Sequence, residues 1–250
     1  ASDVYKRQAQ GDGIMEFGLR RAQGPDAGLY GARAAVIGGC VGTSNVLAGE
    51  MFDVPVMGTH AHSWIMTFKD EYTAFKEYAR LYPDACTLLV DTYDTLKSGV
   101  PNAIRVFTEM REAGIKPKSY GIRLDSGDLA YLSKKARKML DDAGFQDAVI
   151  AASNDLDEFL IHDLKMQGAA ISSWGVGTNL ITSKDCPSFG GVYKLAAIQN
   201  AEGEFQPKIK ISENIEKITN PGNKTIYRIY DKETGMLRAD PVSYTHLRAH

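Results

Sequence analysis

Arginine, aspartate, serine and glycine stand close together in the segment GIRLDSGDL. Arg123 and Asp125 alternate at the end of a strand-like run, so both side chains can face the same side, and Ser126 and Gly127 then begin a turn towards a helix-like stretch. A guanidinium binds phosphate oxygens, a carboxylate binds hydroxyls or a magnesium shell, and glycine allows close backbone approach. This mixture suits a sugar that bears phosphates. A surface ion pair beside a capping serine explains the isolated segment equally well.

Two histidines, His60 and His62, follow another strand-like run in the segment GTHAHSW. Histidine titrates near neutral pH and can shuttle protons, bind a metal or accept a phosphoryl group. Asp91, which opens the cluster DTYDT, is a carboxylate that could orient such a ring. The alternative is a structural histidine held by hydrogen bonds. Because no third ligand stands at a suitable spacing, we expect no zinc site.

Two further clusters combine amide, carboxylate and glycine groups. In ASNDLDE, Asn154 and Asp155 could either cap the following helix or bind ribose hydroxyls. In WGVGTNL, Gly175, Gly177 and Thr178 form a turn whose N–H groups could hold a monophosphate. Many turns of this kind bind no ligand, so the glycine motif is weak when taken alone.

An aromatic residue stands beside arginines nearer the beginning of the chain. In EFGLRRAQGPDAG, Phe17 precedes Arg20 and Arg21 by a few positions. An aromatic ring and a guanidinium together can stack on a flat aromatic carboxylate and neutralise it. Composition alone favours the plainer interpretation, in which a solvated basic turn lies beside a core phenylalanine.

The polar clusters must be positioned by the elements between them. Short apolar runs typical of buried strands precede the clusters and span residues 54–57, 87–90, 119–122, 148–151 and 169–172. Helix-like stretches with apolar residues every three or four positions span residues 68–81, 96–113, 129–143 and 156–166. Residues 29–52 should form packed helices and residues 225–230 a strand. Parallel strands joined by helices end on one side, so we expect an α/β fold whose clusters meet at one rim.

Composition limits the class of protein. The chain has 250 residues, 44% of them hydrophobic and 24% charged, and a net charge of −2, as expected of a soluble globular protein. Acidic and basic residues are interspersed, which argues against binding to nucleic acid or to an anionic membrane. The three cysteines lack CxxC spacing and favour a reducing compartment. No apolar run approaches the roughly 20 residues of a membrane span, so we expect a cytoplasmic protein.

Both ends of the chain resemble translated sequencing-adapter DNA. One DNA that encodes DVYKRQ near the beginning has a reverse complement that encodes VSYTH near the end. We therefore expect residues 1–8 and 242–250 to be non-native and the genuine chain to be an internal fragment. Within it, residues 9–192 should form the core of an α/β barrel, and residues 193–241 should return to a second domain.

Six motifs, taken together and in order, resemble those of the nicotinate phosphoribosyltransferase family of bacterial type. They are EFGLRRAQGPDAG, VGTSNVLAGEMFDVPVMGTHAHSW, DTYDT, GIRLDSGDL, GVGTNLITS and GGVYKL. The resemblance implies the fold of the type II phosphoribosyltransferases, an irregular parallel α/β barrel that is incomplete here, with part of a sandwich domain. It also implies a homodimer when the protein is full length.

The activity implied by the resemblance belongs to NAD salvage. Members of the family join nicotinate to 5-phosphoribosyl 1-pyrophosphate (PRPP), giving nicotinate mononucleotide and pyrophosphate, with Mg²⁺ and with ATP hydrolysis coupled through a phosphohistidine. The resemblance assigns the phosphohistidine to His62 and its orientation to Asp91, and it assigns PRPP to Arg123 and Asp125. These four residues form the expected catalytic set, and no protein metal site is expected.

The resemblance also assigns the substrate-binding residues. Thr43 and Ser44 stand where relatives that use nicotinamide are expected to carry an acidic residue, which favours the acid substrate. The other assignments are Phe17 and Arg20 for nicotinate, Ser126 and Gly127 for PRPP, Asn154 and Asp155 for ribose, and Gly175, Gly177 and Thr178 for the 5′-phosphate.

Several other functions compete with this assignment. A nicotinamide phosphoribosyltransferase or a quinolinate phosphoribosyltransferase shares the architecture, but the latter needs a more basic pocket than the motifs offer. A sugar-phosphate lyase or isomerase on a barrel needs a lysine at a strand end, and none of the five clusters has one. A non-catalytic barrel that binds sugar phosphates is the non-enzyme alternative. The presence of both His62 and Asp125 argues against it.

Overall fold

The chain forms two compact units. The computed structural model describes residues 2–188, 194–209, 211 and 220–244. The units are Ala1–Pro187 and Ser188–His250, and each is considered by itself. Of the expected non-native ends, residues 1 and 245–250 lie outside the described residues, and so does most of the motif GGVYKL.

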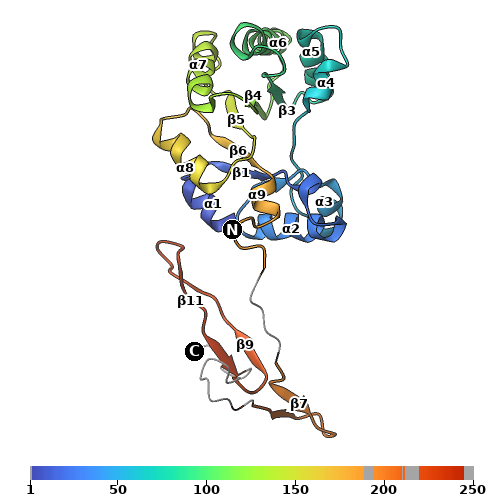
Figure 1. Ribbon diagram of the computed structural model, residues 1–250, viewed down its shortest axis with the longest axis vertical. Coiled ribbons are helices and arrows are strands. Elements are labelled where there is room, and N and C mark those ends of the chain that lie inside the picture. Colours follow the sequence, from blue (N-terminus) through green and yellow to red (C-terminus); the bar gives the residue numbers. More distant parts are fainter. Residues whose placement is uncertain (1, 189–193, 210, 212–219, 245–250) are drawn as a thin grey trace. The chain divides into compact units, whose positions relative to one another are not determined.

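A six-stranded parallel sheet with the order β2-β1-β6-β5-β4-β3 forms the centre of unit 1 (Figure 1). The strands are β1 (Gly13–Glu16), β2 (Gly42–Thr43), β3 (Ala85–Leu89), β4 (Ser119–Leu124), β5 (Val149–Ala152) and β6 (Ser173–Val176). Every pairing within this sheet is parallel. The curled sheet with its crossover helices confirms the expected incomplete parallel α/β barrel.

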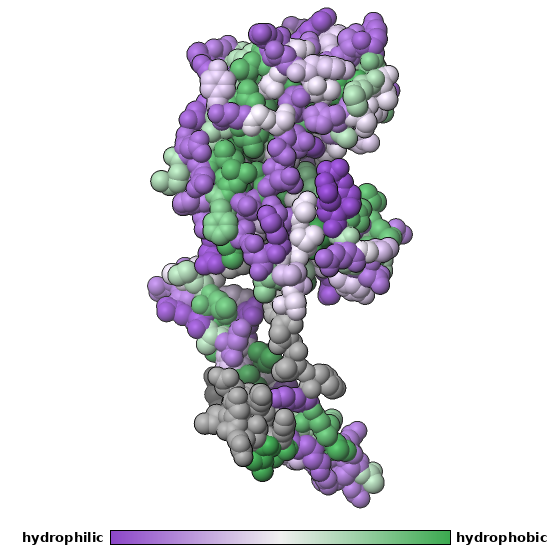
Figure 2. All heavy atoms as spheres, in the orientation of Figure 1, coloured by the Kyte–Doolittle hydropathy of each residue, from purple (hydrophilic) through white to green (hydrophobic). Residues whose placement is uncertain are grey.

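Helices connect the strands and cover the sheet. Those before β3 are α1 (Ser2–Gln8), η1 (Leu19–Arg21), α2 (Pro25–Ile37), α3 (Val46–Phe52), α4 (His62–Met66) and α5 (Glu71–Leu81). Those after β3 are η2 (Thr95–Gly99), α6 (Val100–Glu112), α7 (Leu129–Asp142), α8 (Glu158–Met166) and α9 (Thr178–Ile181). Polar side chains cover the outward surfaces of α5, α6 and α7 at the top of the view (Figure 2). Their apolar faces pack on the sheet, as amphipathic crossover helices must.

The two faces of the sheet differ in the size of their side chains. The outer face lies under the helices and is almost inaccessible, with exposures of at most 1% for Ile14, Leu88, Ile122, Ile150 and Trp174. The inner face carries mostly small residues, among them Thr87, Gly121, Ala151 and Ser173. A Cβ on Gly121 would lie 2.0 Å from the carbonyl oxygen of Val149. Glycine is therefore required where β4 passes β5.

The prediction of a strand at residues 54–57 was wrong. Only one isolated bridge, between Thr43 and Val56, forms in this segment. Pro55 has no N–H to donate to a ladder, and Asp53 turns the chain sharply with a φ of +53° at the end of α3. The polar cluster GTHAHSW therefore follows an extended segment beside the sheet, and His62 begins α4.

Three further strand predictions needed correction. Along the chain, the last strand of this sheet is β6. It begins at Ser173, four residues after the predicted start at Ala169, so Trp174, Gly175 and Val176 belong to the strand itself. Strands β1 and β2 were missed: β1 holds only two apolar residues between Gly13 and Glu16, and β2 is two residues long. Residues 29–52 consequently contain a strand between α2 and α3.

Unit 2 consists of short antiparallel strand pairs. They are β7 (Ala197–Gln199) with β8 (Phe205–Pro207), β9 (Lys224–Ile226) with β12 (Val242–Tyr244), and β10 (Ile229–Tyr230) with β11 (Leu237–Ala239). The strand predicted at residues 225–230 is thus divided between β9 and β10. Arg228, between β9 and β10, forms an ion pair with Asp240, between β11 and β12. Two hydrogen bonds join them, each with an N···O distance of 2.9 Å.

Candidate active site

A cleft of about 500 Å³ lies at the carboxyl ends of β1, β4, β5 and β6. The predicted site residues that line it are Phe17, Arg20, His62, Arg123, Asp125, Asn154, Asp155, Gly175, Gly177 and Thr178. They come from five segments that are far apart in the sequence, and the parallel sheet brings them to one rim. Asp91, Thr43, Ser44, Ser126 and Gly127 do not line this cleft.

His62 lies between two carboxylates. Its Nε2 atom is 3.9 Å from Asp91 Oδ1 and 3.6 Å from Asp125 Oδ2. Its Nδ1 atom is 3.0 Å from the hydroxyl oxygen of Thr92. The side chain is 37% exposed, so the ring is held by its neighbours and still reachable from the cleft. This arrangement suits an imidazole that must gain and lose a positive charge or a phosphoryl group.

Asp91 lies behind the cleft and fixes the turn that follows β4. Its side chain is 1% exposed, and its Oδ2 atom accepts hydrogen bonds from the Asp125 N–H at 2.9 Å and the Ser126 hydroxyl at 2.5 Å. Among the described residues, no group donates a hydrogen bond to Oδ1. A buried carboxylate oxygen without a donor is costly, and the Nε2 atom of His62 lies 3.9 Å from it. Asp91 thus links the histidine to Asp125.

Arg123 is a buried cation at the edge of the cleft. Its side chain is 14% exposed, its Nη2 atom is 3.7 Å from Asp125 Oδ1, and its Nη1 atom donates to the Thr59 hydroxyl. Nε has no hydrogen-bond partner in the described part of the chain. Burial lowers the pKa of Arg123, while the charges of Asp125 and Asp91 act in the opposite direction. A guanidinium that is incompletely compensated in this way favours the arrival of an anion.

Ser126 and Gly127 form the turn between β4 and α7. Ser126 donates to Asp91, and Gly127 adopts a φ of +76°, a conformation that suits glycine. The N-cap of α7 is Asp128, whose carboxylate accepts a hydrogen bond from the Tyr131 N–H at 2.9 Å. The capping role considered for Ser126 therefore belongs to Asp128, and Ser126 holds the turn against Asp91.

Asn154 and Asp155 follow β5 in an unusual conformation. Their φ angles are +93° and +43°, a region that few residues other than glycine adopt. The cap of α8 is Asp157, which accepts from the Leu160 N–H at 2.7 Å. The alternative that Asn154 or Asp155 caps this helix is thereby excluded, and both residues line the cleft.

Phe17 lies against Gly175 at the opposite wall of the cleft. A Cβ on Gly175 would be 2.7 Å from the Phe17 ring, so this contact requires glycine in β6. The Phe17 N–H donates to the carbonyl of Val176 at 2.8 Å and continues the pairing of β1 with β6. Arg20, which is exposed on η1, lines the same cleft.

Glu16 is a buried carboxylate to which sequence reasoning gave no role. It is 0% exposed, accepts a hydrogen bond from the Gly18 N–H, and accepts a second from the Thr43 hydroxyl at 2.6 Å. Thr43 is also 0% exposed, so its hydroxyl serves Glu16 and does not reach the cleft. Ser44 lines a different cavity on the inner face of the sheet. The short apolar run Ile14–Met15 that Glu16 follows was not recognised as a strand, so little in the sequence signalled this carboxylate.

Removal of the Glu16 carboxylate should destabilise the chain. We expect Glu16→Ala to lower the free energy of unfolding by about 3 kcal/mol, because it leaves the Gly18 N–H and the Thr43 hydroxyl buried without an acceptor. Glu16→Gln should cost clearly less, since the amide oxygen accepts from Gly18 and the amide nitrogen can donate to Thr43. Urea unfolding of the unsubstituted chain, Glu16→Ala and Glu16→Gln measures their free energies of unfolding. Equal losses in the two variants would contradict this role of Glu16.

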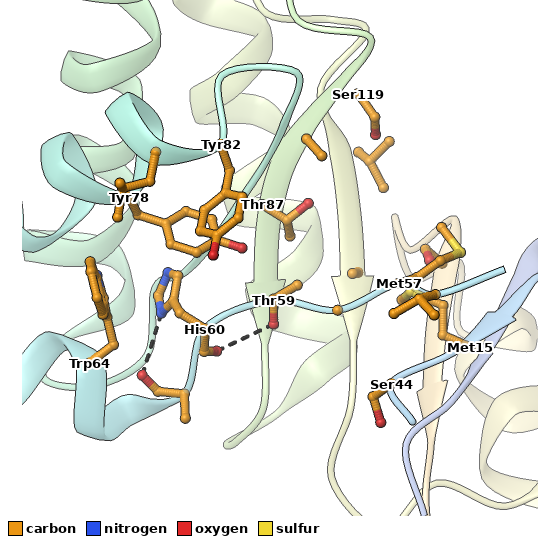
Figure 3. A pocket seen from close by; sticks show the side chains of 18 of the residues that line it. Met15, Ser44, Met57, Thr59, His60, Trp64, Tyr78, Tyr82, Thr87 and Ser119 are labelled. Carbon is orange, nitrogen blue, oxygen red and sulfur yellow. Dashed lines mark hydrogen bonds between the residues drawn. The ribbon is translucent and has the colours of Figure 1, made fainter. Parts of the chain in front are cut away.

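His60 lies in the wall of the inner-face cavity, which has a volume of about 750 Å³ (Figure 3). It is 7% exposed, and its Nε2 atom accepts a hydrogen bond from the Leu89 N–H at 3.2 Å. Its ring meets that of Tyr78 edge-on, with centroids 4.6 Å apart. Burial lowers the pKa of His60 to about 4. His60 is therefore a neutral structural histidine. This is the alternative to a functional role that the sequence left open.

The buried His60 should make stability depend on pH. Because its pKa is about 4 in the folded chain and ordinarily 6.5, its contribution is complete above pH 6.5 and is lost as the pH falls towards 4. The loss amounts to about 3 kcal/mol at most. His60→Gln should flatten the dependence of unfolding free energy on pH in this range. Urea unfolding at several pH values measures this dependence. If its slope is the same in His60→Gln as in the unsubstituted chain, the assignment of His60 as a buried neutral histidine is refuted.

Two features are absent from the part of the chain that the structure describes. No group of three or more His, Cys, Asp or Glu side chains there could hold a metal ion. Within the same residues, no helix has the length and apolarity that crossing a membrane requires.

Comparison with known proteins identifies the family. The model of the nicotinate phosphoribosyltransferase (NAPRTase) family matches residues 13–234. The chain belongs to the nicotinate phosphoribosyltransferase family. The curated nicotinate phosphoribosyltransferase of Bacillus subtilis (strain 168) is 57% identical over 92% of this chain and 46% of its own length. That of Homo sapiens is 34% identical over 86% of this chain and 49% of its own length.

Solved structures agree with the fold. The crystal structure of human nicotinic acid phosphoribosyltransferase gives a TM-score of 0.70 at 28% identity, covering 100% of this chain and 55% of that chain. The nicotinate-nucleotide pyrophosphorylase from Pyrococcus furiosus gives 0.63 at 25% identity, covering 100% and 58%. The chain spans about half the length of the relatives it matches.

Proposed function

We propose that the cleft is the phosphoribosyl transfer site of a nicotinate phosphoribosyltransferase of NAD salvage. The reaction joins nicotinate to PRPP and gives nicotinate mononucleotide and pyrophosphate. The observation that carries the proposal is the meeting of a buried guanidinium, carboxylates, a glycine turn and an aromatic–arginine pair at one rim. Family membership supports the choice of reaction, and the residues that line the cleft support the proposed roles.

The donor occupies the side of the cleft formed by β4, β5 and β6. Arg123 meets the pyrophosphate, whose negative charge grows as the bond to the sugar breaks. Asn154 and Asp155 bind the ribose hydroxyls, while the backbone at Gly177 and Thr178 binds the 5′-phosphate. Asp125 faces the ribose, where its negative charge stabilises the developing oxocarbenium ion. No covalent intermediate with the sugar is needed.

Nicotinate occupies the wall formed by Phe17 and Arg20. The flat pyridine ring stacks on Phe17, and the guanidinium of Arg20 neutralises the carboxylate. Thr43 acts here only through Glu16, which fixes the N–H of Gly18 and so the turn that leads to Arg20. Preference for the acid over the amide then depends on Arg20 rather than on a direct contact with Thr43 or Ser44, which do not line the cleft.

His62 couples ATP hydrolysis to transfer. An imidazole nitrogen forms a bond to the γ-phosphorus of ATP as the bond to the bridging oxygen breaks and ADP leaves. Water later cleaves the phosphorus–nitrogen bond and releases phosphate. The phosphoryl group adds negative charge beside Asp91 and Asp125, which alters how the Asp125 turn is held.

Magnesium fits the site as a partner of the substrate. The described residues offer no cluster that would bind the ion on their own. Mg²⁺ is commonly held by one or two carboxylates together with substrate phosphates, and Asp125 and Asp155 are the carboxylates that line the cleft. When bound, the ion neutralises charge on the pyrophosphate leaving group.

The full-length protein is proposed to be a cytoplasmic homodimer. Val46, Leu47 and Met51 on α3 are exposed, which leaves apolar surface available to a second copy. Cys40 and Cys86 are buried free thiols, in keeping with a reducing compartment. Light scattering of the full-length protein gives the number of subunits.

A chimera allows the reaction to be assayed. In it, residues 13–234 replace the matching segment of the Bacillus subtilis relative. Nicotinate, nicotinamide and quinolinate are each supplied with PRPP, with and without ATP, and the mononucleotide product is measured. We expect nicotinate to be used and ATP to accelerate its use. Preference for nicotinamide or release of CO₂ from quinolinate would favour the corresponding alternative, and no product from any of them would contradict the proposal.

A further inference from the structure

The loop after β5 needs an external support. Asn154 and Asp155 have φ angles of +93° and +43°, and residues other than glycine keep such angles only where their surroundings enforce them. Each residue also lines the cleft, so the conformation of this loop sets where their side chains lie. The support must therefore come from groups that hold the loop backbone.

Asn179 provides contacts of this kind. Its side-chain Nδ2 atom donates to the carbonyl of Asp155 at 3.1 Å and to the carbonyl of Leu156 at 3.0 Å. The residue is 9% exposed, so water competes little for these bonds. One side-chain amide thus uses both of its protons on two successive carbonyls of the strained loop.

Asn179 also belongs to the segment after β6, where the backbone at Gly177 and Thr178 is proposed to bind the 5′-phosphate. It lies on the short helix α9 directly after Gly177 and Thr178, which line the cleft. Gly177 has a φ of −115° and a ψ of −100°. The side chain of Asn179 therefore connects the turn after β6 with the loop after β5, and it does so from behind both.

We propose that Asn179 is a positioning residue that holds the two loops in register for PRPP. The inference rests on the proposed function and adds a residue to it. Asn179 touches no substrate; it keeps the distance between the ribose loop and the 5′-phosphate turn constant. Its loss should raise the KM for PRPP more than the KM for nicotinate, because Phe17 and Arg20 lie on a different element.

Two substitutions of Asn179 should raise the KM for PRPP to different extents. Asn179→Ala removes both donors and should raise the KM for PRPP about tenfold in the chimera. Asn179→Asp places carboxylate oxygens against the two carbonyls and should raise it further. Thr182→Ala is the matched control: it lies just after the same helix, loses a hydrogen bond to the Thr178 carbonyl, and does not contact the loop.

Amide hydrogen exchange tests whether Asn179 holds the loop after β5, independently of the transfer reaction. Faster exchange of the amides of residues 154–156 in Asn179→Ala, with a raised KM for PRPP, supports the proposal. Unchanged exchange shows that Asn179 does not hold the loop and overturns it. Faster exchange with an unchanged KM for PRPP overturns the positioning role. A parent chimera without transfer rejects the proposed function and the positioning role, while the exchange data still decide whether Asn179 supports the loop.

Discussion

His62→Ala abolishes the coupling of ATP hydrolysis to transfer in the chimera while a slower, uncoupled reaction continues. The ratio of ATP hydrolysed to mononucleotide formed falls towards zero, because no imidazole remains to accept the γ-phosphoryl group. The rate with ATP falls about a hundredfold. Asp125 loses its neighbour His62, but Arg123, Asp125 and the glycine turn all remain in the cleft, so PRPP and nicotinate still bind.

His162→Ala is the control for this result. His162 is exposed on α8 and does not line the cleft, and its replacement should leave both the ratio and the rate unchanged. Stoichiometry is measured by following ADP and mononucleotide in one reaction. An unchanged ratio in His62→Ala would refute the assignment of the phosphohistidine.

Arg123→Ala reduces kcat/KM for PRPP by a factor of about 10³. The substitution removes the buried cation that meets the pyrophosphate, and it leaves Asp125 without its basic neighbour at 3.7 Å. Arg123→Lys should recover only a small part of the loss. An ammonium carries the charge but lacks the planar fork that binds phosphate through two bonds.

Arg80→Ala controls for the loss of a positive charge. Arg80 is exposed on α5, where it pairs with Glu77 at 2.8 Å, and its removal should leave kcat/KM for PRPP unchanged. Initial rates at varied PRPP and saturating nicotinate measure the effect. Equal kinetics for Arg123→Ala and Arg80→Ala would place the pyrophosphate elsewhere.

Local patterns predicted the helices and the rim well. The stretch 129–143 shows an uninterrupted helical period, and α7 spans Leu129–Asp142. The segment GIRLDSGDL placed Arg123 and Asp125 at a strand end because residue spacing along a strand is a local property. The same local reasoning failed at residues 54–57, where Pro55 prevents a ladder despite the apolar pattern.

The supporting residues could not be predicted because their partners are distant in sequence. Glu16 is defined by its bond to Thr43, 27 positions away, and Asn179 by its bond to the carbonyl of Asp155, 24 positions away. Neither residue type signals such a bond by itself. The resemblance placed Thr43 and Ser44 at the substrate, but Thr43 is buried on the edge strand β2 and Ser44 lines the inner-face cavity.

PRPP is proposed to bind in the cleft formed at the ends of β4, β5 and β6. Calorimetric titration of PRPP with Mg²⁺ into the chimera tests this binding without requiring turnover. We predict binding of one PRPP per chain in the parent chimera and in Thr182→Ala, and loss of most of the affinity in Arg123→Ala. Equal affinity in all three proteins would contradict the account.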